Sequence, residues 1–243
     1  MKTLVGVLQA RTGSTRLPGK VLRPLRGHSV LSWVVRAARA SEALDDLVVA
    51  TTTEPADDLV VAECEALDVA VHRGSVDDVL GRFLGAIADR DADAVVRFTG
   101  DCPLLDPALV AMAAQAWRAA PWLDYISTAL PRCLPRGMDV EVVRAATLRE
   151  VGGTATGYHR THVTSGVYTD PVRYRLLGLN LHPDSSDLRV TLDTEDDFAL
   201  IEALVTALGD RPPSLADVVG FLRTRPDVAA LNAHVRQKPL VAG

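Results

Sequence analysis

Residues 4–20 read LVGVLQARTGSTRLPGK, and this stretch decides the fold class. Its first part, residues 4–10, is a short apolar run, which predicts a β-strand buried on both faces. The loop behind it carries three cations, Arg11, Arg16 and Lys20, with three hydroxyl side chains and two glycines. Open α/β sheets bind ligands beyond the carboxyl ends of their strands. The stretch therefore predicts an anion-binding loop at the edge of an α/β sheet.

Short apolar runs alternate with helix-period segments along the rest of the chain. Further strands are predicted at residues 47–51, 69–71, 94–99, 125–129, 138–143, 174–181 and 188–192. Helix starts are predicted at Asp106-Pro107 and at three capping-box patterns, residues 75–78, 194–197 and 214–217. The alternation predicts one domain, residues 1–243, with a mostly parallel sheet and helices on both faces.

Composition excludes several classes of protein. The chain has 243 residues, 48% of them hydrophobic, and a net charge of −5, so binding to nucleic acid through general attraction to phosphates is not expected. The longest apolar run, residues 108–114, is far shorter than the ~20 residues of a membrane helix, and no signal-peptide pattern is seen. Cys64, Cys102 and Cys133 form no CxxC pair, so we expect reduced thiols in a cytoplasmic protein, with Cys102 and Cys133 in the core.

The loop matches neither of two familiar phosphate-binding motifs. Five residues separate Gly13 from Gly19, and Lys20 is followed by Val21 rather than by Ser or Thr, so it is not a P-loop. The dinucleotide fingerprint GxGxxG is also absent. The alternative interpretation, a basic surface turn, fits poorly with this density of cations in an acidic chain.

Two aspartates follow predicted strands at the edge where the cationic loop lies. Asp101 comes two residues after the strand at 94–99, and Asp193 directly follows the strand at 188–192. Carboxylates there would suit a Mg²⁺ ion that bridges phosphate oxygens. The alternatives are a turn aspartate at 101 and helix capping at 193, although Thr194 already fills the capping role.

These motifs resemble the cytidylyltransferase family that includes CMP-Kdo synthetases, and more specifically its spore-coat-polysaccharide branch. The resemblance begins with residues 9–22 and continues in order along nearly the whole chain. It is carried by residues 49–52, 73–83 (RGSVDDVLGRF), 99–103 (TGDCP), 137–142 (GMDVEV), 162–164, 189–198 and 232–238.

The resemblance implies a nucleotidyltransferase-type, Rossmann-like fold that joins CMP from CTP to an acceptor, with Mg²⁺ as cofactor and a possible homodimer. Residues 1–129 would form the CTP half, and residues 130–243 would supply the acceptor side and closing elements. Asp101 and Asp193 match the family's metal-binding aspartates, and with Arg11 and Lys20 they form the expected catalytic set. The expected CTP-binding residues are Gln9, Ala10, Arg11, Gly13, Ser14, Arg16, Lys20, Ala50, Thr51, Thr52, Arg73, Gly74, Ser75, Asp78, Arg82, Thr99 and Gly100. The expected acceptor-binding residues are Arg136, Asp139, Glu141, Arg160 and His162.

Two departures from the family pattern concern the acceptor. Relatives usually carry Asp-Gly where this chain has Arg136-Gly137, and Arg-Glu-His-Val where it has residues 160–163, RTHV. Each change removes an acid, and the first adds a cation. A sugar acid fits the family, whereas a hydroxyalkyl phosphonate or a related small anion fits the added positive charge. For His159 and His162 the alternative is that they cap or pack a helix.

Three functional hypotheses follow from the sequence. The leading one is an enzyme that transfers CMP from CTP to a small anionic acceptor and releases pyrophosphate. The second is a non-catalytic nucleotide-binding module, which would not need both aspartates. The third is a nucleotidyltransferase for another base, such as a molybdopterin-type guanylyltransferase, whose loop would begin Gly-Gly where this chain has Gln9-Ala10-Arg11.

Overall fold

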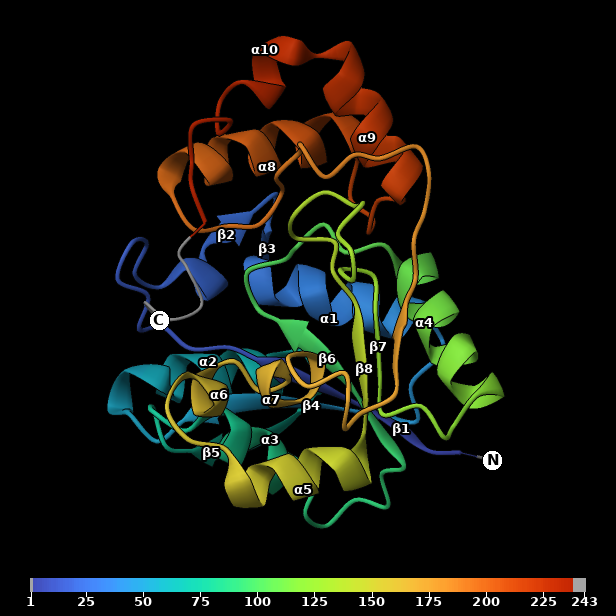
Figure 1. Ribbon diagram of the computed structural model, residues 1–243. Coiled ribbons are helices and arrows are strands. Elements are labelled where there is room, and N and C mark those ends of the chain that lie inside the picture. The colour runs from blue at the N-terminus through green and yellow to red at the C-terminus, as the bar shows by residue number, and fades with distance from the viewer. Residues whose placement is uncertain (1, 238–243) are drawn as a thin grey trace.

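The centre of the fold is a seven-stranded sheet with strand order β5-β4-β1-β6-β8-β7-β9 (Figure 1). The computed structural model describes residues 2–237. The sheet strands are β1 (Leu4–Gln9), β4 (Asp46–Thr52), β5 (Ala70–Gly74), β6 (Ala94–Thr99), β7 (Tyr125–Ser127), β8 (Glu141–Arg144) and β9 (Leu176–Gly178). A separate antiparallel pair is formed by β2 (Pro24–Leu25) and β3 (His28–Ser29).

The strand directions place the ends of the first four sheet strands at one edge. Strand β1 pairs in parallel with β4 and β6, and β4 pairs in parallel with β5. Strand β8 runs antiparallel to both β6 and β7, and β9 is parallel to β7. The predicted mostly parallel sheet is therefore confirmed, and the switch in direction falls between β6 and β8. Ligands in open sheets of this kind bind beyond the carboxyl edge.

Helices cover both faces of the sheet because its strands are apolar on both sides. Leu4 and Leu8 of β1 belong to a core with α1, α4 and α8, whereas Val5 and Val7 point to the other face and pack with α3, α5 and α7. Figure 1 shows α1 and α4 on one side of the sheet and α3 and α5 on the other. The α-helices are α1 (Val30–Ala40), α2 (Asp58–Ala66), α3 (Val79–Ala86), α4 (Pro107–Ala119), α5 (Ala145–Thr154), α6 (Tyr158–Thr161), α7 (Ser165–Tyr168), α8 (Glu195–Leu208), α9 (Leu215–Thr224) and α10 (Pro226–Ala229), and the 3-10 turns are η1 (Lys20–Leu22) and η2 (Pro55–Asp57).

Three of the four predicted helix starts are confirmed. Asp106 caps α4, and Thr194 and Ser214 open α8 and α9 with reciprocal capping boxes. The capping box predicted at 75–78 is wrong. The N-cap of α3 is Asp78, which accepts a hydrogen bond from the amide of Gly81, so residues 75–77 stay in the loop.

The strand predicted at 188–192 is also wrong. Its alternating Leu188, Val190 and Leu192 are buried in the core, as the pattern implied. Its backbone, however, bonds to two different loops: the Val190 amide donates to the Arg136 carbonyl and the Leu192 amide to the Asp101 carbonyl. Only a single bridge forms, between Arg136 and Arg189. Among residues 2–237, no helix is long and apolar enough to cross a membrane.

Candidate active site

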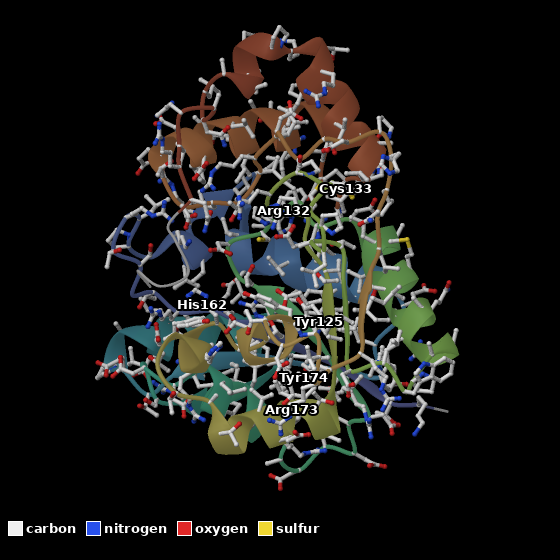
Figure 2. All side chains as sticks on the ribbon, in the orientation of Figure 1. Tyr125, Arg132, Cys133, His162, Arg173 and Tyr174 are labelled. Carbon is white, nitrogen blue, oxygen red and sulfur yellow. The ribbon has the colours of Figure 1, made fainter. Side chains whose placement is uncertain are left out.

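A cavity of about 480 Å³ opens at the carboxyl edge of the sheet, where β1 and β6 end. The loop after β1 forms one wall, and α3, α6 and Asp193, which precedes α8, contribute others. Figure 2 shows His162 between this loop and α6. The predicted site residues that line the cavity are Gln9, Ala10, Arg11, Gly13, Ser14, Arg16, Lys20, Arg82, Thr99, Gly100, Asp101, His162 and Asp193.

Lys20 joins the two predicted metal-binding aspartates. Its Nζ lies 2.8 Å from Asp101 Oδ2 and 2.9 Å from Asp193 Oδ1, and it also donates to the Leu192 carbonyl at 2.7 Å. Burial alone would lower the pKa of Lys20, but the two carboxylates outweigh burial and raise it. The lysine is therefore charged at neutral pH, and both carboxylates converge on one cation.

A second layer of charged groups holds Asp193 in place. Arg16 Nη2 and Arg189 Nη2 each lie 2.8 Å from Asp193 Oδ2. Behind them Asp197 accepts hydrogen bonds from Arg189, from the Asp193 amide and from Asn232. Burial would raise the pKa of Asp193, but Lys20, Arg189 and Arg16 lower it overall. Asp193 is thus an ionised carboxylate in a preorganised position.

The cationic loop is anchored to η2 by a residue that the sequence did not single out. Asp57 accepts hydrogen bonds from both the amide and the hydroxyl of Thr12, each at 2.7 Å, and from the hydroxyl of Thr52. The Thr12 carbonyl in turn accepts from the amides of Ser14 and Gly19. The loop is therefore a fixed turn whose cationic side chains face the cavity.

Two arginines approach one backbone carbonyl in the loop that precedes α3. Arg11 Nη1 lies 3.4 Å from the Val76 carbonyl, and Arg82 Nη1 lies 3.1 Å from the same oxygen. Burial and the charge of Arg11 lower the pKa of Arg82. Like charges held this close favour an anion between them.

Several predicted CTP-binding residues lie behind this wall. Ala50, Thr51 and Thr52 are buried in β4. Arg73 donates to the carbonyls of Thr52 and Glu54 and pairs with Asp58. Gly74 ends β5, the Ser75 carbonyl accepts from Arg82, and Asp78 caps α3 and pairs with Arg160.

Predicted acceptor-binding residues are spread over three places. Arg160 donates to Gly152 as well as to Asp78, which ties α6 to α3 and α5. Arg136 lines a separate cavity of about 160 Å³ near Arg189 and Asn232. Asp139 forms a bidentate pair with Arg132. Of the predicted acceptor set, His162 alone is in the cavity wall that residues 2–237 form.

The remaining residue of that set, Glu141, belongs to a polar network whose main member the sequence did not indicate. Glu141 pairs with Arg97 of β6 and accepts hydrogen bonds from Tyr125 and Thr164. Arg97 lines the cavity. Burial would raise the pKa of Glu141, but Arg97 and the hydroxyl donors lower it. The signal available in the sequence for this network was a cationic residue, Arg97, inside the apolar strand predicted at 94–99.

The donor set fits Mg²⁺, which usually binds one or two carboxylates and completes its shell with phosphate oxygens and water. Asp101 and Asp193 already converge on a cation, the ammonium of Lys20. Within residues 2–237 no group of three or more His, Cys, Asp or Glu side chains is arranged to hold a metal by itself. A metal here would therefore need oxygens from a bound substrate.

The chain is similar in sequence to proteins of known family. The chain is 35% identical over 240 residues to the spore coat polysaccharide biosynthesis protein SpsF of Bacillus subtilis, covering 94% of this chain and 98% of that protein. It is 38% identical over 130 residues to the 3-deoxy-manno-octulosonate cytidylyltransferase of Bdellovibrio bacteriovorus, about half of each chain.

Solved structures show the same fold. A cytidylyltransferase from Leptospira borgpetersenii superposes with a TM-score of 0.91 at 25% identity, covering 98% of this chain and all of that one. The structure of CMP:2-keto-3-deoxy-manno-octonic acid synthetase in complex with CTP superposes with a TM-score of 0.67 at 17% identity over 85% of this chain and 99% of that one. The family model described as cytidylyltransferase matches residues 5–165, and the chain therefore belongs to the cytidylyltransferase family.

Proposed function

We propose that the protein transfers CMP from CTP to a hydroxyl group of a small anionic acceptor and releases pyrophosphate. The observation that carries this proposal is the convergence of Asp101 and Asp193 on Lys20, a cation of the fixed loop. A negatively charged triphosphate matches the loop, and a reaction at the α-phosphate would take place where the loop meets the two aspartates.

Each cation of the loop has a role in this reaction. Arg11 and Arg16 bind the outer phosphates and stabilise the charge that develops on departing pyrophosphate. Lys20 contributes its charge at the boundary between these phosphates and the aspartates. Arg82 beside Arg11 completes the positive wall, and a bound phosphate would offset the repulsion that lowers the pKa of Arg82.

Asp101 and Asp193 would hold Mg²⁺. When bound, this ion would polarise the α-phosphate and lower the pKa of the attacking hydroxyl group. The chain's own contribution is to aim both carboxylates at the same point, through Lys20, and to keep Asp193 ionised by the three cations around it. Direct attack by the acceptor needs no protein nucleophile. Burial and the charge of Asp101 raise the pKa of Cys102, so its thiol stays protonated.

Two acceptor classes remain in this proposal, a sugar acid and a hydroxyalkyl phosphonate. Both carry an anion next to a hydroxyl group. The similarity to a 3-deoxy-manno-octulosonate cytidylyltransferase supports the sugar acid, and the cationic character of the cavity supports either one.

A panel of the four nucleoside triphosphates tests the proposal, with pyrophosphate release as the readout and both acceptor classes present. CTP should be used, and UTP should be used roughly tenfold to a hundredfold less well, because a mismatched buried hydrogen bond costs about 1–3 kcal/mol. Binding of CTP without release under every condition would indicate a non-catalytic module. Preference for GTP would mean a different base specificity.

A further inference from the structure

A row of polar side chains crosses the sheet just behind the cavity. Gln9 of β1, Arg97 of β6, Glu141 of β8 and Tyr125 of β7 all belong to strands that pair side by side. Arg97 donates to Gln9 Oε1 from Nε at 3.3 Å and from Nη2 at 3.2 Å, and from Nη1 to Glu141. Tyr125 donates to Glu141 at 2.8 Å. The row is thus connected from end to end.

The hydrogen bonds of this row do not use all the N–H donors of Arg97 and Gln9. A guanidinium group has five N–H donors, and the bonds to Gln9 and Glu141 account for three of those on Arg97. Arginine can only donate, so its bonds fix the amide of Gln9 with the oxygen toward Arg97 and the NH₂ group away from it. Both residues line the cavity. Arg97 and Gln9 together therefore present only N–H donors to a bound molecule.

Arg97 belongs to a different strand from the triphosphate loop, which Gln9 at the end of β1 directly precedes. The sheet changes direction between β6 and β8, and Arg97 lies at that boundary. The loop cations follow β1 and Arg82 lies in α3, whereas Arg97 lies in β6. Thr99, Thr161 and His162 line the same cavity as Arg97, and the carboxylates among the described lining residues are Asp77, Asp101 and Asp193.

We propose that Arg97 and the amide NH₂ of Gln9 bind the anionic group of the acceptor, a carboxylate or a phosphonate. Glu141 is a positioning residue, since it holds the guanidinium of Arg97 from behind and is itself held by Tyr125 and Thr164. This inference rests on the proposed function and adds the residues that select for an acidic acceptor. It also moves that role from Arg136 and Arg160, whose side chains lie outside the cavity wall.

The test is calorimetric binding to protein saturated with the α,β-methylene analogue of CTP, which cannot react. The probes are 3-deoxy-manno-octulosonate, its neutral methyl ester, and 2-hydroxyethylphosphonate, so that the two acids distinguish a carboxylate from a phosphonate source. The wild type should bind at least one acid, and the ester should bind at least tenfold more weakly if the sugar acid is the one that binds. Arg97→Gln should weaken binding of that acid by about ten- to a hundredfold. The affinity of the Arg97→Gln variant for the CTP analogue should change by less than about threefold.

Three further variants guard against misfolding and test the geometry. Arg97→Lys keeps the charge but loses the forked donor, so it should recover part of the acid affinity. If Arg97→Gln fails to fold, the double variant Arg97→Gln/Glu141→Gln replaces it, because it leaves no unpaired buried carboxylate. The double variant should show the same loss of acid affinity. Arg90→Gln removes a half-buried pair with Asp46, away from the cavity, and should bind like the wild type.

The outcomes separate this inference from the proposed function. If the wild type holds the CTP analogue but binds neither acid, or if Arg97→Gln weakens the CTP analogue rather than the acid, the assignment of Arg97 is overturned while CTP use stands. Equal loss of acid and ester binding would also overturn it, because an anion contact must distinguish the two. If the wild type neither binds the CTP analogue nor releases pyrophosphate from CTP, the proposed function fails, and this inference fails with it.

Discussion

At the scale of single residues, the side chain of Lys20 holds two distant segments of the chain together at the cavity. It is 8% exposed, and its ammonium group joins Asp101 and Asp193, which lie 81 and 173 positions away along the chain. A buried ammonium is costly unless it is paired and hydrogen-bonded. The two carboxylates offset that cost, so the lysine and the aspartates form one charged unit at the cavity.

Asp101→Asn and Asp193→Asn should each reduce pyrophosphate release on the order of a hundredfold or more at saturating Mg²⁺. Both replacements are nearly isosteric, whereas a carboxylate charge is needed to hold the ion. Steady-state pyrophosphate release measures the effect, with circular dichroism to verify the fold. Asp187→Asn is the matched control, since Asp187 pairs with Arg223 on the surface and should be dispensable for turnover. Near wild-type activity of either variant would remove that aspartate from the metal site.

At the scale of elements, the segment at 188–193 depends on a close approach by residues 136–138. Gly137 has φ = +106°, and a Cβ at that position would lie 2.5 Å from the Thr191 amide nitrogen. Only glycine combines this backbone conformation with this contact. The two segments hold each other through the Arg136–Arg189 bridge, which places Asp193 at the cavity.

Gly137→Ala should therefore lower the free energy of unfolding by at least about 2 kcal/mol, from backbone strain and overpacking. It should also reduce turnover, because Asp193 would shift with its segment. Gly153→Ala is the control: Gly153 lies in α5, nothing lies within 4 Å of an added Cβ, and alanine favours a helix by up to about 1 kcal/mol. Urea unfolding of both variants measures the difference. Equal stability of the two variants would contradict the argument.

On the scale of the whole molecule, Asp197 connects the start of α8 to segments far from it in sequence. Its side chain is 0% exposed and accepts from Arg189 and, at 2.8 Å each, from the Asp193 amide and Asn232. Burial alone would raise the pKa of Asp197, but Arg189 and the amide donors lower it below its ordinary value of 3.8. Its contribution to stability is thus present above about pH 4 and is lost as the pH falls through the lowered pKa.

Asp197→Asn should destabilise the protein by about 3–5 kcal/mol at pH 7, because Arg189 loses a buried counter-charge. It should also lose less stability than the wild type between pH 5 and pH 3, since the titrating group is gone. Asp217→Asn is the matched control: Asp217 holds the same third helical position in the capping box of α9, but its side chain is 36% exposed, so its loss should cost about 1 kcal/mol or less. Chemical denaturation at several pH values compares them. An acid dependence of Asp197→Asn equal to that of the wild type would refute the linkage.

Much of the framework follows from local sequence. The apolar run at 4–10 became β1, and the caps at Asp106, Thr194 and Ser214 open helices as predicted. The strand-end position of Asp101 was sufficient to predict that it would meet the cationic loop, since parallel strands end at one edge. Asp193 meets the loop for another reason: the strand expected before it does not form, and the Leu192 amide instead donates to the Asp101 carbonyl. These features depend on backbone geometry within a few residues, which local side chains specify.

Tertiary structure alone decided which side chains pair across long separations. Asp197 and Asp217 occupy equivalent places in equivalent motifs, yet only Asp197 is buried against an arginine, because α8 packs against segments 189–193 and 232. Residue 238, the last residue of the stretch 232–238 that resembles the family, lies outside the described residues.

Arg160 pairs with Asp78, which lies 82 positions away along the chain. Arg97 lines the cavity because its strand, β6, pairs with both β1 and β8. A linear pattern records neither contact, because each exists only after distant strands and loops have been brought together by burial of the core.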